Sequence, residues 1–213
     1  MRKAKICGLS TPQTVQAALD GGAAYLGFVF FDRSPRNVAP ELAARLIAPV
    51  RQTAAKAVAL LVDPDDATVD QIARIVRPDF IQLHGRETPE RTAAVAARAG
   101  IPVIKVLPVS EAADIDPARA YEGAAEHLMF DAKPPKDADR PGGLGEPFDW
   151  TLLAGRRFER PYLLAGGLDP WNVAQALASS GAPIADVSSG VERGPGLKDP
   201  SLIAAFLEAV RRV

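Results

Sequence analysis

The sequence predicts a single-domain α/β protein, a (β/α)8 barrel (TIM barrel) that spans residues 1–213. Short apolar runs typical of strands alternate with longer Ala-rich amphipathic stretches typical of helices. The alternation favours a parallel sheet, and eight strand–helix units in 213 residues suit a closed barrel at the short end of its usual length. No linker or low-complexity segment divides the chain, which disfavours the alternative, an open doubly wound sheet.

The apolar, β-rich runs predict eight strands. They are expected at Ala4–Cys7, Tyr25–Val29, Ala57–Val62, Phe80–Leu83, Val103–Leu107, Leu128–Asp131, Tyr162–Ala165 and Ala185–Val187. One irregular stretch, Lys133–Pro147, is rich in Pro, Gly and charge, and it predicts a long active-site loop after the sixth strand.

Helices are expected in the intervening segments. Their predicted ranges are Pro12–Gly21, Pro40–Val50, Asp66–Val76, Pro89–Ala99, Asp116–Glu122, Trp150–Ala154, Pro170–Ser179 and Pro200–Val213. Several begin with a capping residue followed by Pro, as in Thr11-Pro12, Thr88-Pro89, Asp169-Pro170 and Asp199-Pro200.

Composition excludes several classes of protein. The chain is 47% hydrophobic with a net charge of −1, so it is neither largely disordered nor basic enough to attract nucleic acid or an anionic membrane. No apolar run approaches the ~20 residues of a spanning helix, and neither a membrane partner nor a secretory signal is expected. The single cysteine allows no internal disulfide and predicts a cytoplasmic location.

Active sites of (β/α)8 barrels lie where strands end and loops begin, and reactive groups stand at these positions. Cys7 ends the first strand, with Lys5 on the same strand face. Its thiol is either a general base, with a pKa lowered toward working pH by Lys5 and a nearby helix N-terminus, or an inert buried group. Asp131 ends the sixth strand and is either a general acid with a raised pKa or a loop cap.

Glycine and serine follow the seventh and eighth strands, where barrels often bind phosphate. The runs are Gly166-Gly167 and Ser188-Ser189-Gly190, and they predict a phosphate cradle of backbone N–H groups and a hydroxyl. Each run alone is equally typical of a tight turn. Together they predict a small phosphorylated substrate as the binding partner.

Other polar residues are less specific. Arg36 suits a carboxylate or phosphate, or it is a solvated loop residue. His84 is a candidate for orienting substrate, whereas His127 opens a strand at the opposite end and receives no role. One Cys and two scattered His give no zinc-ligand spacing, so no metal is expected. No dinucleotide or Walker pattern appears, so no cofactor is expected either.

These pieces together resemble phosphoribosylanthranilate isomerase of tryptophan biosynthesis. The matching segments occur in family order along the whole chain: KICG (5–8), LGFVF (26–30) with SPR (34–36), QLHG (82–85), IKV (104–106), FDAKPP (130–135), GG (142–143) with FDW (148–150), LAGGL (164–168), NV (172–173) and DVSSGVE (186–192) with PGLKD (195–199). Each is weak alone, but the set in this order is specific.

The resemblance implies an Amadori rearrangement of N-(5'-phosphoribosyl)anthranilate to 1-(2-carboxyphenylamino)-1-deoxyribulose 5-phosphate. Asp131 would protonate the furanose oxygen and open the ring to a Schiff base, and Cys7 would remove the C2 proton. Arg36 would hold the anthranilate carboxylate, and Gly166, Gly167, Ser189 and Gly190 would cradle the phosphate. The iminium serves as the electron sink, so the resemblance implies no cofactor.

The resemblance is imperfect, and other functions are compatible with parts of the sequence. Where the family commonly has a Thr-Gly-Lys-Thr-like run, residues 144–147 read Leu-Gly-Glu-Pro. The resemblance therefore does not define the lid formed by this loop, or any role for a lysine in it. Indole-glycerol-phosphate synthase would need acidic partners for Lys105, which are not evident in the sequence, and ribulose-phosphate epimerase would need further histidines. A non-catalytic phosphate-ligand-binding barrel is the alternative from another class, and it would lack the Cys7 and Asp131 pair. Two alternatives stay open at this point. The chain could also accept the related aminoaldose of the histidine pathway, and it could be a monomer or a homodimer.

Overall fold

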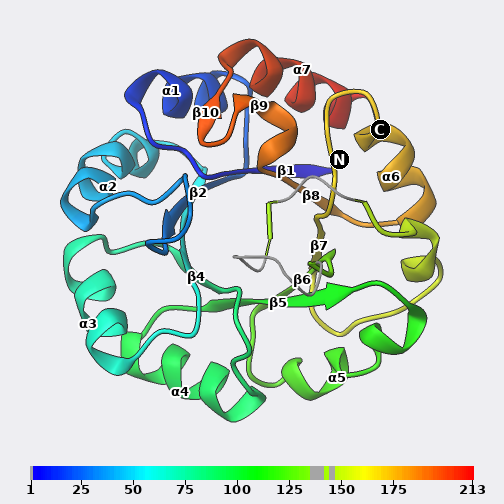
Figure 1. Ribbon diagram of the computed structural model, residues 1–213, viewed down its shortest axis with the longest axis horizontal. Coiled ribbons are helices and arrows are strands. Elements are labelled where there is room, and N and C mark those ends of the chain that lie inside the picture. Colours follow the sequence, from blue (N-terminus) through cyan, green and yellow to red (C-terminus); the bar gives the residue numbers. More distant parts are fainter. Residues whose placement is uncertain (1, 135–141, 144–146) are drawn as a thin grey trace.

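The computed structural model describes residues 2–134, 142–143 and 147–213, and it is a closed barrel of eight parallel strands (Figure 1). The barrel strands are β1 (Lys3–Cys7), β2 (Tyr25–Phe30), β3 (Lys56–Leu61), β4 (Phe80–Leu83), β5 (Val103–Val109), β6 (His127–Ala132), β7 (Tyr162–Leu164) and β8 (Ile184–Val187). They follow the chain order around the barrel. The predicted barrel is therefore confirmed, and the open sheet is excluded.

The barrel closes between its first and last strands. Lys5 of β1 lies opposite Asp186 of β8, and Cys7 lies opposite Gly27 of β2 on the other side. Because side chains alternate along a strand, Lys5 and Cys7 both face the barrel interior while Ile6 packs outward. This register places a lysine, a cysteine and an aspartate at the same part of the barrel wall.

Helices form the outer ring in Figure 1. They are α1 (Pro12–Asp20), α2 (Pro40–Ile47), α3 (Asp66–Ile75), α4 (Pro89–Ala99), α5 (Ala118–Tyr121), α6 (Val173–Ser180) and α7 (Pro200–Arg211). Side chains of Thr11, Asp65, Thr88 and Asp199 cap the N-termini of α1, α3, α4 and α7.

Two of the predicted helices differ from the prediction. Asp169-Pro170 does not begin α6: the Asp169 carboxylate accepts hydrogen bonds from Trp171 and Asn172 in a turn, and the helix starts after Asn172. The segment expected at Trp150–Ala154 is a single 3-10 turn, Trp150–Leu153. In both places a short side-chain-capped turn replaces the first α-helical turn.

The apolar core has two layers. One lies between strands and helices and includes Ile6, Phe28 and Phe206. The other fills the barrel, where Tyr25, Met129 and Leu163 form one cluster and Cys7, Val29 and Leu60 a second. Burial of this second cluster removes Cys7 from water.

A two-stranded hairpin after β8 was not predicted. Its strands are β9 (Glu192–Gly194) and β10 (Leu197–Lys198). Gly196 turns between them with φ of 79°, and a Cβ there would collide with the Pro35 carbonyl group. The hairpin therefore rests on the loop after β2, and this contact brings Glu192 and Lys198 to Arg36.

The loop predicted over Lys133–Pro147 lies mostly outside the described residues. Gly142 and Gly143 belong to its described part and lie against the barrel mouth. Within the described residues, no helix has the length and apolar character required to cross a membrane.

Candidate active site

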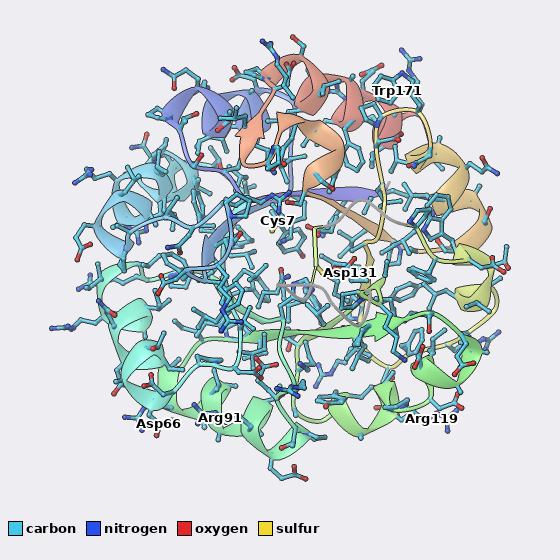
Figure 2. All side chains as sticks on the ribbon, viewed as in Figure 1. Cys7, Asp66, Arg91, Arg119, Asp131 and Trp171 are labelled. Atoms are coloured by element: carbon cyan, nitrogen blue, oxygen red, sulfur yellow. The ribbon has the colours of Figure 1, made fainter. Side chains whose placement is uncertain are left out.

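One cavity opens at the carboxyl ends of the barrel strands, where the sequence predicted a site. Of the eight predicted site residues, the cavity wall contains Cys7, Arg36, His84, Asp131, Gly166, Gly167 and Ser189. Figure 2 shows Cys7 and Asp131 inside the ring of strands, on separate elements. The closed barrel thus brings residues 124 positions apart (131 minus 7) to one cavity.

Gly190 is the exception, because it is absent from the cavity wall. A Cβ at this position would overlap the carbonyl group of Leu168. Glycine is required there for close packing between the loops that follow β7 and β8. The contact between the Gly190 N–H and phosphate stays a prediction.

Cys7 is 3% exposed and lies beside Lys5 and Asp186. Burial raises the pKa of the Cys7 thiol, and the Asp186 carboxylate raises it further, while Lys5 and Lys198 oppose both effects. The expectation of a lowered pKa is therefore wrong for this thiol without substrate. The physical reason is that desolvation of a thiolate outweighs the attraction of cations that already have carboxylate partners.

Asp131 is the penultimate residue of β6 and is 8% exposed. Its Oδ1 accepts a hydrogen bond from the Ala132 N–H at 2.9 Å, and its Oδ2 lies 3.2 Å from His84 Nε2. A Cβ on Gly142 would lie 2.7 Å from the same Oδ2, so the loop backbone approaches the carboxyl group closely. The carboxyl group thus lies between the end of β6, His84 after β4 and the described part of the loop after β6.

His84 contacts Asp131 in this structure and is in turn contacted by Gln82. Gln82 Nε2 lies 3.4 Å from His84 Nδ1. An amide N–H donor at Nδ1 favours the tautomer that carries its proton on Nε2, facing Asp131. Gln82 belongs to the QLHG motif, but sequence reasoning assigned it no role. Its position in the barrel, two residues before His84 on the same strand face, was a usable signal.

Arg36 is 5% exposed and paired with a carboxylate of the protein itself. Its Nε and Nη2 donate to the two oxygens of Glu192 at 2.7 and 2.9 Å, and Nη2 also donates to the Gly143 carbonyl at 3.3 Å. Among the described residues, Nη1 has no hydrogen-bond acceptor. The guanidinium group therefore offers one nitrogen, rather than a free bidentate fork, to a ligand.

Glu192 and Lys198 were missed as members of the site. Lys198 Nζ donates to Glu192 Oε1 and to the Ser188 carbonyl at 3.0 Å. Burial lowers the pKa of the Lys198 ammonium, although Glu192 partly offsets this, whereas Arg36 and Lys198 hold the pKa of the buried Glu192 carboxyl below its usual value. Sequence reasoning could not find this cluster, because it depends on a hairpin that folds back onto the loop after β2.

Gly166 and Gly167 adopt φ of 86° and 66°, a left-handed backbone that glycine readily adopts. Trp150 Nε1 donates to the Gly166 carbonyl at 3.3 Å, and Asn172 Nδ2 donates to the Gly167 carbonyl at 2.8 Å. The N–H groups of both glycines find no acceptor within the described residues. With their carbonyls engaged elsewhere, these N–H groups are free to bind an anion.

Lys105 has an acidic partner that the sequence did not reveal. Its ammonium contacts the Glu87 carboxylate and donates to the Gly85 carbonyl at 2.8 Å. Glu87 also accepts from the N–H groups of Asp63 and Gly85. This buried pair lies outside the cavity wall and braces the loops after β3 and β4.

Comparison with known proteins agrees with this geometry. The family model described as N-(5'-phosphoribosyl)anthranilate (PRA) isomerase matches residues 4–209. A protein of Caulobacter vibrioides named N-(5'-phosphoribosyl)anthranilate isomerase is 65% identical over 209 residues, covering 98% of this chain and 95% of that protein. One of the same name from Rhodospirillum centenum is 55% identical over 204 residues, covering 95% of each chain.

Solved structures show the same fold. Phosphoribosyl anthranilate isomerase from Thermotoga maritima has a TM-score of 0.88 and 34% identity, with both chains covered completely. A phosphoribosyl anthranilate isomerase in complex with reduced 1-(o-carboxyphenylamino)-1-deoxyribulose 5-phosphate has a TM-score of 0.84 and 31% identity, again over both whole chains. The chain belongs to the N-(5'-phosphoribosyl)anthranilate isomerase family.

Proposed function

We propose that Cys7 is the general base and Asp131 the general acid of the isomerisation that names the family. The substrate is N-(5'-phosphoribosyl)anthranilate, and the product is 1-(2-carboxyphenylamino)-1-deoxyribulose 5-phosphate. The observation that carries the assignment is that β1 and β6 place one thiol and one carboxyl group on the wall of the same cavity. Both reacting groups are therefore within one substrate-sized site.

Family membership confirms the predicted isomerase of tryptophan biosynthesis. It also decides against the non-catalytic phosphate-binding barrel. The epimerase and synthase alternatives lose their support as well, although Lys105 does have an acidic partner.

Asp131 acts first, by giving its proton to the furanose ring oxygen. The C1–O bond breaks, and the nitrogen lone pair forms the C1=N bond of a protonated Schiff base. The resulting carboxylate is stabilised by the hydrogen bond from the Ala132 N–H, and the His84 ring lies beside it, with Nε2 3.2 Å from Oδ2. We assign His84 to the support of the acid, and its predicted role in orienting substrate stays a prediction.

Cys7 acts second, as a thiolate. It removes the proton from C2, and the C–H electron pair moves toward the iminium nitrogen to give the enolamine. Tautomerisation then transfers the enol proton away and protonates C1, which yields the ketone. Proton transfer alone completes this sequence, because the iminium accepts the electron pair.

The remaining predicted residues bind the two anionic ends of the substrate. Gly166 and Gly167 offer free N–H groups and Ser189 a hydroxyl, which suit a phosphate monoester. Arg36 offers Nη1 to the anthranilate carboxylate, and its contact with Glu192 fixes the direction of that donor. This division leaves C1, C2 and the ring oxygen between Cys7 and Asp131.

The test is turnover by wild type, Cys7→Ala and Asp131→Asn, with substrate generated in situ from anthranilate and phosphoribosyl pyrophosphate by a transferase. Loss of substrate fluorescence reports the reaction. Each variant is expected to lose about a hundredfold or more in kcat. Activity that survives Cys7→Ala would move the base to another residue, and an inactive wild type that still binds a phosphorylated ligand would sink the assignment.

Assembly, location and domain organisation stay predictions. A solved relative from Thermotoga maritima is described as a dimeric phosphoribosylanthranilate isomerase, and for this chain we propose a monomer or a homodimer. Sedimentation equilibrium distinguishes them. We also propose a single domain that works in the cytoplasm, where reducing conditions keep Cys7 as a thiol.

A further inference from the structure

Lys5 is a buried charge that the catalytic steps above do not use. Its side chain is 0% exposed, although an ammonium group is costly to remove from water. It lies on β1 two residues before Cys7, on the same face of the strand. A cation in this position requires both a partner and a reason to face the barrel interior.

The partner is Asp186 of β8. Lys5 Nζ lies 2.7 Å from Asp186 Oδ1, and the two residues are directly opposite each other in the β1–β8 register. Asp186 itself reaches the cavity wall. The carboxylate therefore holds the lysine from the β8 side and leaves the other side of the ammonium group facing Cys7.

Gly27 of β2 shows how close the ammonium and the thiol are. A Cβ built on Gly27 would lie 2.9 Å from Cys7 Sγ and 3.1 Å from Lys5 Nζ. Both atoms thus occupy the space that a side chain at position 27 would fill. Glycine at position 27 therefore leaves room for both groups on the same part of the barrel wall.

We propose that Lys5, fixed by Asp186 and given room by Gly27, is a positioning residue that stabilises the Cys7 thiolate. The proposal rests on the assignment of Cys7 as the base. When Cys7 loses its proton, the new negative charge forms next to a cation that is already in place and already dehydrated. No reorganisation is then needed at the moment of proton abstraction.

Charged groups on neighbouring elements also affect the pKa of the Cys7 thiol. Lys198 of β10 favours the thiolate and Asp186 opposes it, and burial opposes it most. The other ionisable groups of the described cavity region are Arg36 with its partner Glu192, His84, Asp131 and Lys133. Burial lowers the pKa of Lys5, but the Asp186 carboxylate, together with Cys7, more than offsets this and holds the pKa above its ordinary value.

The experiment titrates the thiol directly. Because Cys7 is the only cysteine of the chain, thiolate absorbance and alkylation by iodoacetamide report this residue alone, with Cys7→Ser as the blank. Lys5→Met is expected to raise the titration midpoint by about one pH unit or more, which corresponds to about a tenfold loss of thiolate at a given pH. A Lys5→Met midpoint equal to that of wild type would overturn the proposal.

Two further variants separate electrostatics from damage to the fold. Lys105→Met breaks the other buried lysine–carboxylate pair, outside the cavity wall, and should leave the Cys7 midpoint in place. An equal shift of the Cys7 midpoint in Lys105→Met would overturn the proposal, because general loosening of the barrel would then explain the shift. If Lys5→Met does not fold, the double variant Lys5→Met/Asp186→Asn leaves no unpaired charge, and its midpoint should still lie above that of wild type.

Turnover provides the second readout. The acidic limb of the kcat/KM profile should move to higher pH by the same amount as the thiol midpoint in Lys5→Met. If Cys7→Ala stays active, the proposed base is wrong, yet the thiol titration still measures the effect of Lys5. If Lys5→Met moves the thiol titration midpoint but not the kcat/KM profile, Lys5 affects the thiol without contributing to catalysis. The proposal that Lys5 positions the base for the reaction is then wrong.

Discussion

The Arg36 guanidinium and the Glu192 carboxylate form a buried two-point ion pair, with donor–acceptor distances of 2.7 and 2.9 Å. Arg36 follows β2 and Glu192 begins β9, so the pair joins segments 156 residues apart. A planar fork held at two nitrogens has a fixed orientation. The ligand-facing nitrogen is therefore positioned before substrate arrives.

Glu192→Gln should raise KM roughly tenfold, which is about 1.4 kcal/mol. The amide offers one acceptor in place of two and leaves Arg36 and Lys198 without a counter-charge. Steady-state kinetics measure the effect, and kcat should change less because Glu192 is remote from the proton transfers. Glu208→Gln, which alters an exposed pair with Arg211, is the control and should leave KM unchanged. Equal KM values for Glu192→Gln and wild type would show that Arg36 needs no fixed orientation.

Gly27→Ala should reduce kcat strongly, by about tenfold or more, while the barrel still forms. The added methyl group would sit closer than 3.2 Å to both Cys7 Sγ and Lys5 Nζ, so these groups must separate. Gly123→Ala is a matched control, since a Cβ there meets no atom within 4 Å. Kinetics and circular dichroism on both variants make the comparison. Full activity of Gly27→Ala would mean that Cys7 and Lys5 need not be in contact.

Lys105→Met should lower the free energy of unfolding by about 3–5 kcal/mol, because it leaves Glu87 buried and unpaired. Lys56→Met breaks an exposed pair with Asp79 and should change stability by less than about 1 kcal/mol. Urea unfolding followed by circular dichroism measures both. A similar small loss for the two variants would place the Lys105–Glu87 pair in contact with water.

Stability should fall as pH drops below the ordinary pKa of His127. Burial lowers the pKa of this histidine in the folded chain below its ordinary 6.5, so between the two values the unfolded chain binds a proton that the folded chain does not. His127 stacks on Phe80 at a ring distance of 5.3 Å and contacts the Tyr25 hydroxyl. In His127→Phe, which keeps the stacking, the melting temperature should depend less on pH between about 5 and 7. An unchanged pH slope would assign the effect to another group.

Much of the fold was predictable from local patterns. Apolar runs and capping residues such as Thr11 and Asp199 determine where strands and helices begin, because backbone hydrogen bonds and side-chain burial act over a few residues. Eight alternating units and short connections then permit few topologies, and a closed parallel barrel is one of them. Asp169-Pro170 misled the prediction because an Asp can cap a turn as well as a helix.

The sequence by itself determined the barrel and the positions of Cys7 and Asp131 at strand ends, since both follow from short-range order along the chain. Tertiary structure alone decided what surrounds them. The pairing of β1 with β8 brings Asp186 to Lys5, and the β9–β10 hairpin brings Glu192 to Arg36. Desolvation and charge depend on distance in space and not on separation in sequence. For that reason the thiol at Cys7 has a raised pKa, where the sequence had suggested a lowered one.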